Sequence, residues 1–376
     1  MAALMERVFD ALREALAAAP APTTIAPPPD AAESALKGLR RLLEPADGAT
    51  AEQRRVGADA LAALRAPGTE AHVKLLCAAV RRATAAIDAI DRDAAADTAA
   101  AGLTRWGHLR VNAASALLQL ASTELASVEL LERTDGAAAA ACVGLLASRA
   151  ARADAEGVRV GATLLRNLCM PRLSRARVGA LGPPAAADAL LPHVGHREPA
   201  VAGVVAACLR LLVEGCDANA WKFARAAAAS AGDAAAAGDA AAAGAAFAPL
   251  TELELDKLHP FARAELARFV SLTIAAVCGG GDGGADDAAA QRALVSTAAL
   301  RFGPCFLLSS RHATLHQEAA AALGACAALG AAAVAWEPSA LGVQRDGQEV
   351  ALTDALRALV QGGTPTLTPA ECAGLL

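Results

Sequence analysis

The sequence predicts an all-α fold, a right-handed superhelix of about five or six degenerate helical repeats. Three observations predict it: one helical phrase recurs along the chain, its copies follow one another at similar distances, and the clearest copies come after two shorter helices. The best copy occupies residues 158–169 and reads Val-Arg-Val-Gly-Ala-Thr-Leu-Leu-Arg-Asn-Leu-Cys. Because stacked helical units bury one continuous core, a recurring unit indicates the architecture.

The copies align on Leu165, which matches an apolar residue in five other segments. Its counterparts are Leu61, Leu117, Leu209, Phe269 and Leu323. A small or apolar residue stands three positions earlier in each copy, at Ala58, Ala114, Ala162, Ala206, Leu266 and Ala320. An apolar residue stands three positions later, at Leu64, Leu120, Leu168, Leu212, Leu272 and Cys326. Steps of three residues place these side chains on one helical face, so they predict a packing stripe.

The distances between copies are uneven. Successive anchors are 56, 48, 44, 60 and 54 residues apart. The shortest distances approach the roughly 40–47 residues that are typical of repeats made of two or three helices. The surplus residues are therefore interpreted as loop insertions between helices.

The chain is expected to divide into five parts. They are an amphipathic helix at 1–19, a proline-rich linker at 20–32, repeats at 33–225, an Ala/Gly-rich insertion at 226–247, and repeats at 248–376 that contain a glycine-rich loop at 279–284. The apolar stripe of the first helix consists of Leu4, Val8, Phe9, Leu12 and Leu16. Consecutive prolines cannot propagate a helix, and the insertion lacks large apolar groups to bury. We expect the first helix to cap the repeats or to dock on them.

Residues 127–215 can be divided into two triplets of helices, each short, medium and long in order. The predicted helices are 127–134, 138–148 and 157–169, followed by 174–181, 185–194 and 200–215. Pro183-Pro184 and Pro199 mark helix starts, because the missing N–H and fixed φ of proline suit a first turn. This order, with Asp135-Gly136 before a second helix and Leu-Leu-Arg-Asn-Leu-Cys ending a third, resembles armadillo repeats. The resemblance covers residues 105–225, and the flanking blocks match in the stripe alone.

The resemblance implies a binding surface. In armadillo proteins the third helices line a concave groove that receives extended peptides or partner proteins. The residues expected on this surface are Gln119, Arg166, Asn167 and Arg210. Asn167 matches a position from which some armadillo families hold a ligand backbone, since an amide both donates and accepts hydrogen bonds. The tryptophan found four residues earlier in nuclear-import receptors is Thr163 here, which disfavours a peptide ladder of that kind. Alternatively, Asn167 satisfies a backbone group between repeats.

These features predict a non-enzymatic scaffold or adaptor that binds a protein partner, such as an extended or acidic segment, in the groove. The alternative is a regulator of a small GTPase, by nucleotide exchange or as a chaperone, because the third-helix pattern also resembles guanine-nucleotide dissociation stimulators built of armadillo units. The phrases at 164–169 and 211–219 are similar to those of the ataxin-ten family as well.

Composition disfavours nucleic acid and a membrane span. The formal net charge is −5 and the isoelectric point is about 5.8, so the chain lacks the positive charge that drives phosphate binding. Thirty arginines against four lysines, beside 108 alanines, indicate a GC-rich coding bias rather than a nucleic-acid site. The N-terminus does not resemble a signal peptide, and apolar runs of spanning length occur only where poly-alanine is counted. We expect a cytoplasmic protein, with the nucleus as a second possibility.

No catalytic, nucleotide or metal motif emerges, so neither a cofactor nor enzyme activity is predicted. The nine cysteines form no Cys-x-x-Cys pair and are expected to be reduced core residues. His193 and His196 share a helical spacing, as do His312 and His316, but neither pair has the further ligands of a zinc site. Ala313 also stands where a zinc helix carries its glutamate.

Overall fold

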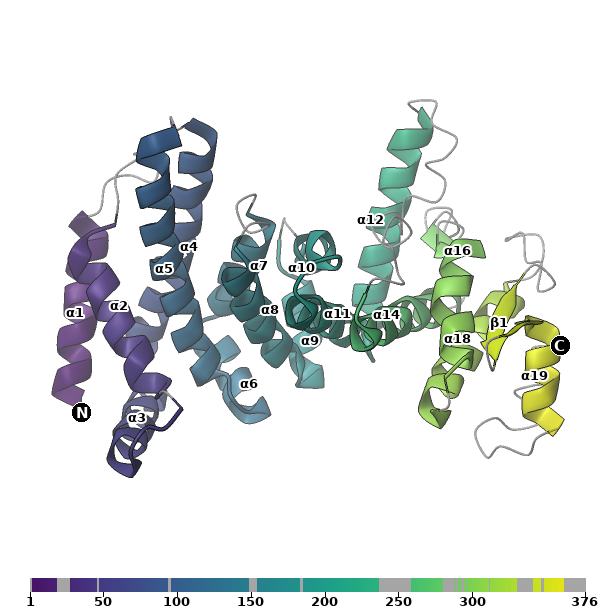
Figure 1. Cartoon of the computed structure of the whole chain (residues 1–376), viewed down its shortest axis with the longest axis horizontal. Coiled ribbons are helices and arrows are strands. Elements are labelled where there is room, and N and C mark those ends of the chain that lie inside the picture. The colour runs from purple at the N-terminus through teal and green to yellow at the C-terminus, as the bar shows by residue number, and fades with distance from the viewer. Residues whose placement is uncertain are drawn as a thin grey trace. The chain divides into compact units, whose positions relative to one another are not determined.

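The structure of this chain is a computed structural model (Figure 1). It describes residues 2–18, 28–45, 47–93, 96–148, 154–182, 185–236, 258–279, 288, 290–291, 294–295, 297–310, 312–329, 341–345 and 348–361. The chain separates into two compact units, Met1–His193 and Val194–Leu376. The described residues are almost entirely helical, which confirms the predicted all-α class.

Helices make up the described part of the first unit. They are α1 (Ala2–Ala18), α2 (Asp30–Leu43), α3 (Ala51–Arg65), α4 (Glu70–Asp93), α5 (Ala96–Leu120), α6 (Glu124–Arg133), α7 (Ala137–Ala147), α8 (Ala155–Cys169), α9 (Arg172–Gly179), α10 (Ala186–Leu190) and the 3-10 helix η2 (Leu191–His193). Helices α2, α5 and α8 pack in succession in one layer, while α4 lies along α5 and α7 along α8 in a second layer (Figure 1). The unit is thus built from packed helices of these two layers, with α3, α6 and α9 between them along the chain.

The second unit contains both helices and a small sheet. Its elements are α11 (Pro199–Val213), α12 (Asp217–Ala236), α14 (Pro260–Gly279), α16 (Thr297–Leu300), the π-helix η5 (Arg301–Cys305), α17 (Phe306–Leu308), α18 (Ala313–Ala328), β1 (Gly342–Arg345), β2 (Gln348–Ala351) and α19 (Leu352–Gln361). Helix α14 lies at the centre of the unit, since α11, α12 and α18 all pack on it.

Local sequence explains several helix boundaries. At the start of α3, the Thr50 side chain accepts a hydrogen bond from the Gln53 backbone N–H, and the Gln53 side chain accepts one from the Thr50 N–H. This reciprocal pair satisfies two N–H groups that have no partner within the helix. Between α6 and α7 the chain turns through Asp135 at φ 49° and Gly136 at φ 78°. Few residues other than Gly, Asn and Asp adopt this left-handed conformation, which accounts for the Asp-Gly pair.

All six helices predicted between residues 127 and 215 are present, as α6 to α11, with ends that differ by a few residues from the expected ones. The largest difference concerns the helix predicted at 185–194. Here α10 ends at Leu190, and the chain continues as the 3-10 helix η2 around Pro192. Proline lacks the N–H that an α-helix needs, so the chain tightens at this point.

The packing stripe is correct in five of its six copies. The aligned residues are buried in α5, α8, α11, α14 and α18, except that Leu272 is half-buried. The copy anchored on Leu61 is wrong: it falls on α3, where Ala58 is exposed and Leu61 is half-buried. In the first unit, the helix that packs beside α5 in the same layer is α2, which buries Leu36, Leu39 and Leu43.

The structure also bears on the expected parts of the chain. Helix α1 buries Met5, Phe9, Leu12 and Leu16 and packs on α2, α3 and α4, so it covers one end of the first unit. Helix α2 begins at Asp30, before the end of the linker placed at 20–32, and α12 continues to Ala236, inside the insertion placed at 226–247. The alanines of that segment favour helix. The glycine-rich loop lies outside the described residues beyond Gly279.

The hairpin of β1 and β2 was not predicted. The two strands are antiparallel, with Val343 paired to Val350, and Val343 is buried. A signal was present, because Asp346-Gly347 stands between two short runs in the sequence, and this dipeptide is the commonest mark of a tight hairpin.

Among the described helices, no single one is long and apolar enough to cross a membrane. Helix α11 and the segment Asp217–Ala226 meet the length and composition requirements only as a pair, with a bend of 112° between them.

The eight described cysteines form no disulfide, and all except the half-buried Cys216 are buried. Burial raises the pKa of Cys77 and that of Cys305 to about 12. These thiols are therefore protonated at neutral pH, which makes them poor nucleophiles and fits the predicted role as core residues. Cys372 lies outside the described residues.

Candidate interaction site

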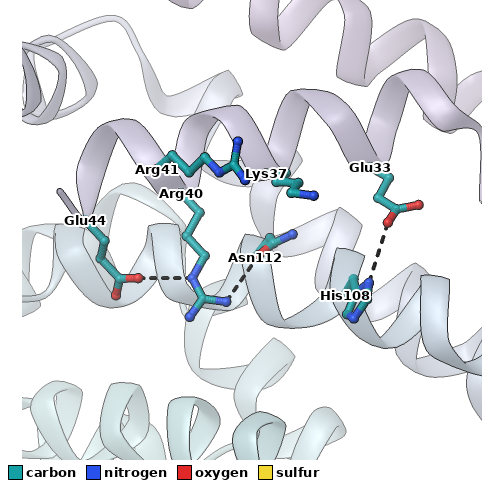
Figure 2. A pocket seen from close by; sticks show the side chains of 7 residues that line it. All are labelled: Glu33, Lys37, Arg40, Arg41, Glu44, His108 and Asn112. Carbon is teal, nitrogen blue, oxygen red and sulfur yellow. Dashed lines mark hydrogen bonds and ion pairs between the residues drawn. The ribbon is translucent and has the colours of Figure 1, made fainter. Parts of the chain in front are cut away.

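A polar groove runs between α2 and α5 in the first unit (Figure 2). Its volume is about 480 Å³, and its lining consists of Glu33, Lys37, Arg40, Arg41 and Glu44 from α2 with His108 and Asn112 from α5. The α2 residues recur at three- and four-residue steps, which places them on one side of that helix. The opposite side carries the buried leucines that pack on the core. We call this feature the α2–α5 groove.

Arg40 connects three helices at one end of the groove. Its Nε donates to Glu44 at 3.0 Å, its Nη1 to the Asn112 side-chain oxygen at 3.3 Å, and its Nη2 to Glu156 of α8 at 2.8 Å. Partial burial opposes its charge, but the hydrogen bonds to Glu156 and Glu44 outweigh burial and raise the pKa of Arg40. Arg40 thus remains charged and is fully engaged in holding α2, α5 and α8 together.

Both carboxylates of the groove also have internal partners. Glu33 accepts a hydrogen bond from Arg105 of α5 at 2.9 Å and lies 3.6 Å from His108. Glu44 accepts from Arg40 and, at 2.9 Å, from the side chain of Gln119. The negative charge of the groove is therefore compensated within the protein.

Lys37 and Arg41 differ from the other charged groups of the groove. Both are exposed, and no described residue forms an ion pair or a side-chain hydrogen bond with either of them. Because the acidic side chains nearby already have cationic or amide partners, the groove presents two uncompensated positive charges to solvent. An open cavity with free cations is suited to binding a negatively charged group.

Two of the predicted binding residues have internal contacts at the carboxyl end of α5. The Asn167 side chain donates to the Ala121 backbone carbonyl at 3.0 Å, and the Gln119 side chain binds Glu44. The last carbonyls of a helix have no partner within it, so Asn167 satisfies one that α5 leaves open. Of the two interpretations of Asn167, the structure shows the contact between repeating helices.

The other two predicted residues lie apart from this pair. Arg166 is half-buried in the last turn of α8, next to Asn167 in sequence. Arg210 belongs to the second unit, where its Nε donates to Glu265 at 2.6 Å and its Nη1 lies 2.9 Å from Glu214. Within that unit, Arg268 of α14 further binds Glu318 of α18 at 2.6 Å. Arg210 therefore belongs to an ion-pair network that connects α11, α14 and α18.

Two arginines outside the predicted set donate hydrogen bonds to backbone carbonyls at the carboxyl ends of helices in the first unit. Arg65 donates to the carbonyls of Gln119 and Leu120 at 3.1 and 3.2 Å, at the end of α5. Arg133 donates to the carbonyls of Leu64 and Arg65 at 3.2 Å each, at the end of α3. Side chains from neighbouring helices thus replace the usual C-terminal caps.

Replacing Asn167 by alanine is expected to lower the free energy of unfolding by about 0.5–1.5 kcal/mol, because the Ala121 carbonyl loses one of its two side-chain donors and keeps the Ser127 hydroxyl at 3.3 Å. The matched control is Arg166→Ala, one position earlier, which should change stability by about 0.5 kcal/mol or less. Urea denaturation followed by circular dichroism measures both. Equal stability of the Asn167→Ala variant and the original protein would contradict the capping role.

The histidine pairs have structural contacts. The Nε2 of His193, which is buried, lies 2.8 Å from the carbonyl oxygen of Leu146, and His316 Nε2 lies 2.6 Å from that of Ser310. Within the described part of the chain, no group of three or more His, Cys, Asp or Glu residues is placed to hold a metal ion.

The groove residues were missed by sequence reasoning for two reasons. The alignment on Leu61 assigned the first repeat to α3 and left α2 without a role. Arginine richness was attributed to coding bias, so the basic residues of α2 were given little weight. A signal existed, since Lys37 and Arg41 stand four residues apart on one face of the segment 33–44.

Comparisons with known proteins identify no family. No family model and no curated protein matches the chain. An engineered protein of known structure shares 17% identity over 86% of this chain and 97% of its own, with a TM-score of 0.42. A second engineered protein shares 16% over 98% and 87%, with a TM-score of 0.40. A chain from a structure concerning a phosphorylation switch in the interaction between cadherin and beta-catenin shares 16% over 90% of this chain and 59% of its own, with a TM-score of 0.33.

Proposed function

We propose that this chain is an armadillo-like helical-repeat scaffold that binds a protein partner in the α2–α5 groove and catalyses no reaction. The fold part of this proposal is supported by the short, medium and long order of helices in α6, α7 and α8. It is supported as well by the succession of α2, α5 and α8 in one layer, with α4 and α7 in another. Stacked units of this kind present one helix from each unit along a shared face.

The observation that carries the binding part is the pair of uncompensated charges on α2. Lys37 and Arg41 are exposed over a groove whose acidic residues have internal partners. A single solvated charge on a surface has no functional implication. Two positive charges over one cavity attract negatively charged groups of a ligand and raise their concentration there. The proposed binding residues thus differ from the predicted set, in which Gln119, Asn167 and Arg210 have internal roles.

Affinity capture from the native cells tests the proposal. Three forms of the full chain are compared: the original protein, the groove variant Lys37→Glu/Arg41→Glu, and the control variant Arg54→Glu/Lys74→Glu. The control reverses one exposed lysine and one exposed arginine on α3 and α4, away from the groove lining. All three should have the same helical circular dichroism.

The original protein and the control should recover the same partner, and the groove variant should recover about tenfold less of it. Like charges facing an acidic partner would repel it, so charge reversal has more effect than truncation. Full recovery of every partner by the groove variant would exclude the groove as the binding site.

A further inference from the structure

The two free cations of the groove have a spacing that selects among acidic partners. Lys37 and Arg41 are four residues apart on α2, which corresponds to a rise of about 6 Å along the helix. In an extended chain, alternate side chains point to the same side and are about 6.6 Å apart. Two acidic residues separated by one residue therefore match the two cations.

The length of the groove limits the size of the segment. Its lining on α2 extends from Glu33 to Glu44, a rise of about 16 Å. An extended chain covers this distance with about five residues. A helix would present acidic side chains at a comparable rise, but its backbone carbonyls are engaged in its own hydrogen bonds, whereas those of an extended chain are free to accept one from the groove.

The groove also offers a group for the peptide backbone. The Asn112 side-chain oxygen accepts a hydrogen bond from Arg40, and its amide nitrogen lies on the side of the groove away from Arg40 (Figure 2). An amide N–H can donate to a backbone carbonyl of a chain that lies along the groove. Asn112 is held in this orientation by Arg40, so the donor is already in position.

The two free cations at the centre of the lining determine the register. Glu33 lies at one end of the lining and Glu44 at the other, with Lys37 and Arg41 between them. An acidic residue at either end of the segment would find no free cation, because Glu33 and Glu44 with their internal partners occupy the ends, whereas the central positions face Lys37 and Arg41. The favoured segment thus has its two acids in the middle and neutral or basic residues at the ends.

We propose that the α2–α5 groove binds an extended segment of about five residues whose central part carries two acidic side chains separated by one residue. This inference rests on the proposed function and specifies the partner. The segment lies along α2, with one acid on Lys37, the other on Arg41, and a backbone carbonyl on Asn112.

Synthetic peptides test the spacing directly. Four fluorescent peptides of equal length are titrated with the full chain at low salt, and binding is read by fluorescence anisotropy. Their central sequences are Asp-Ser-Asp, Asp-Asp-Ser, Asp-Ser-Ser-Ser-Asp and Asn-Ser-Asn. The Asp-Ser-Asp peptide should bind about three- to fivefold more tightly than the two peptides with wrong spacing, because it alone engages both cations and an exposed ion pair contributes at most about 1 kcal/mol. Its advantage over Asn-Ser-Asn, which engages neither cation, should be larger still.

The Lys37→Ala and Arg41→Ala variants should each reduce the affinity for the Asp-Ser-Asp peptide to about that of the peptides with wrong spacing. The control variants Lys74→Ala and Arg54→Ala, each of which removes one positive charge elsewhere, should bind like the original protein. An oligothymidylate of similar length completes the set, since it carries regularly spaced negative charges without a peptide backbone. Its affinity should be lower than that of the Asp-Ser-Asp peptide.

Equal binding of all acidic peptides would overturn the inferred spacing of the two acids. Undiminished binding by the two alanine variants would contradict the roles of Lys37 and Arg41, and tighter binding of the oligonucleotide would contradict a peptide ligand. These outcomes are distinguishable from failure of the proposed function. If the groove variant loses its cellular partner while the peptides show no spacing preference, the groove is the interaction site and the inferred segment is wrong.

Discussion

The Asp154→Ala variant is expected to lose about 3–4 kcal/mol of unfolding free energy, one of the two greatest effects that the structure predicts. Arg110 of α5 is only 1% exposed, and its Nη2 lies 2.5 Å from the Asp154 carboxylate. Its Nε and Nη1 have no hydrogen-bond partner, so Asp154 is the group that compensates this buried charge. Asp154 also accepts a hydrogen bond from the Gly157 N–H at 2.8 Å and caps α8. The alanine variant loses both interactions.

Two further variants separate the charge from the cap. Asp154→Asn retains a good capping residue and removes the charge, so it should be less destabilised than Asp154→Ala by about 1 kcal/mol. Arg110→Met/Asp154→Ser replaces the buried cation by an apolar side chain and keeps a cap, so it should recover most of the lost stability. Urea denaturation followed by circular dichroism measures all three. An Asp154→Ala variant as stable as the original protein would contradict a compensated buried charge.

Leu165→Ala is expected to cost about 2–5 kcal/mol, because this side chain is completely buried in α8 and its removal leaves a cavity. Leu61→Ala, at the position aligned with it in sequence, should cost about 1 kcal/mol or less, since Leu61 is half-buried on α3. The same denaturation experiment compares the two variants. Because both variants replace leucine by alanine, the difference between their losses of unfolding free energy reflects the burial of each position.

A variant of α2 serves as the positive control for this comparison. Leu39 is 1% exposed on the helix that packs beside α5, and Leu39→Ala should therefore resemble Leu165→Ala in cost. If Leu61→Ala proved as damaging as Leu165→Ala, the original alignment would be right and the assignment of α2 to the layer of α5 and α8 would fail.

The helices could be predicted because their determinants are local. The residues that bury in α8 recur at three- and four-residue steps, α11 is an apolar run that is buried on nearly all sides, and prolines and an Asp-Gly pair mark helix ends. The same method failed at Leu61 because alanine-rich sequence matches a small-residue stripe easily. Helix α3 buries a stripe formed by Gly57, Ala60 and Leu64, which shares only Leu64 with the predicted one. Spacing alone did not distinguish these two faces.

The site could not be predicted because it depends on tertiary partners. Arg40 binds Glu156, which is 116 residues away in sequence, and nothing local shows that this arginine is occupied while Arg41 is free. For the same reason Asn167 could be assigned either to a ligand or to the Ala121 carbonyl 46 residues earlier. The residue types indicated that these side chains could form polar contacts, but the partner of each side chain could be identified only from the tertiary structure.

Photo-crosslinking tests the proposed interaction site most directly. A photoreactive benzophenone amino acid replaces His108, whose side chain lines the groove and is 63% exposed, or Leu173, which is 91% exposed on α9 and is the most exposed large apolar residue among those described. Each variant is incubated with extract of the native cells, irradiated and purified. The partner that depends on Lys37 and Arg41 should crosslink to position 108 and not to position 173. Crosslinking of that partner at position 173 alone would contradict binding in the α2–α5 groove.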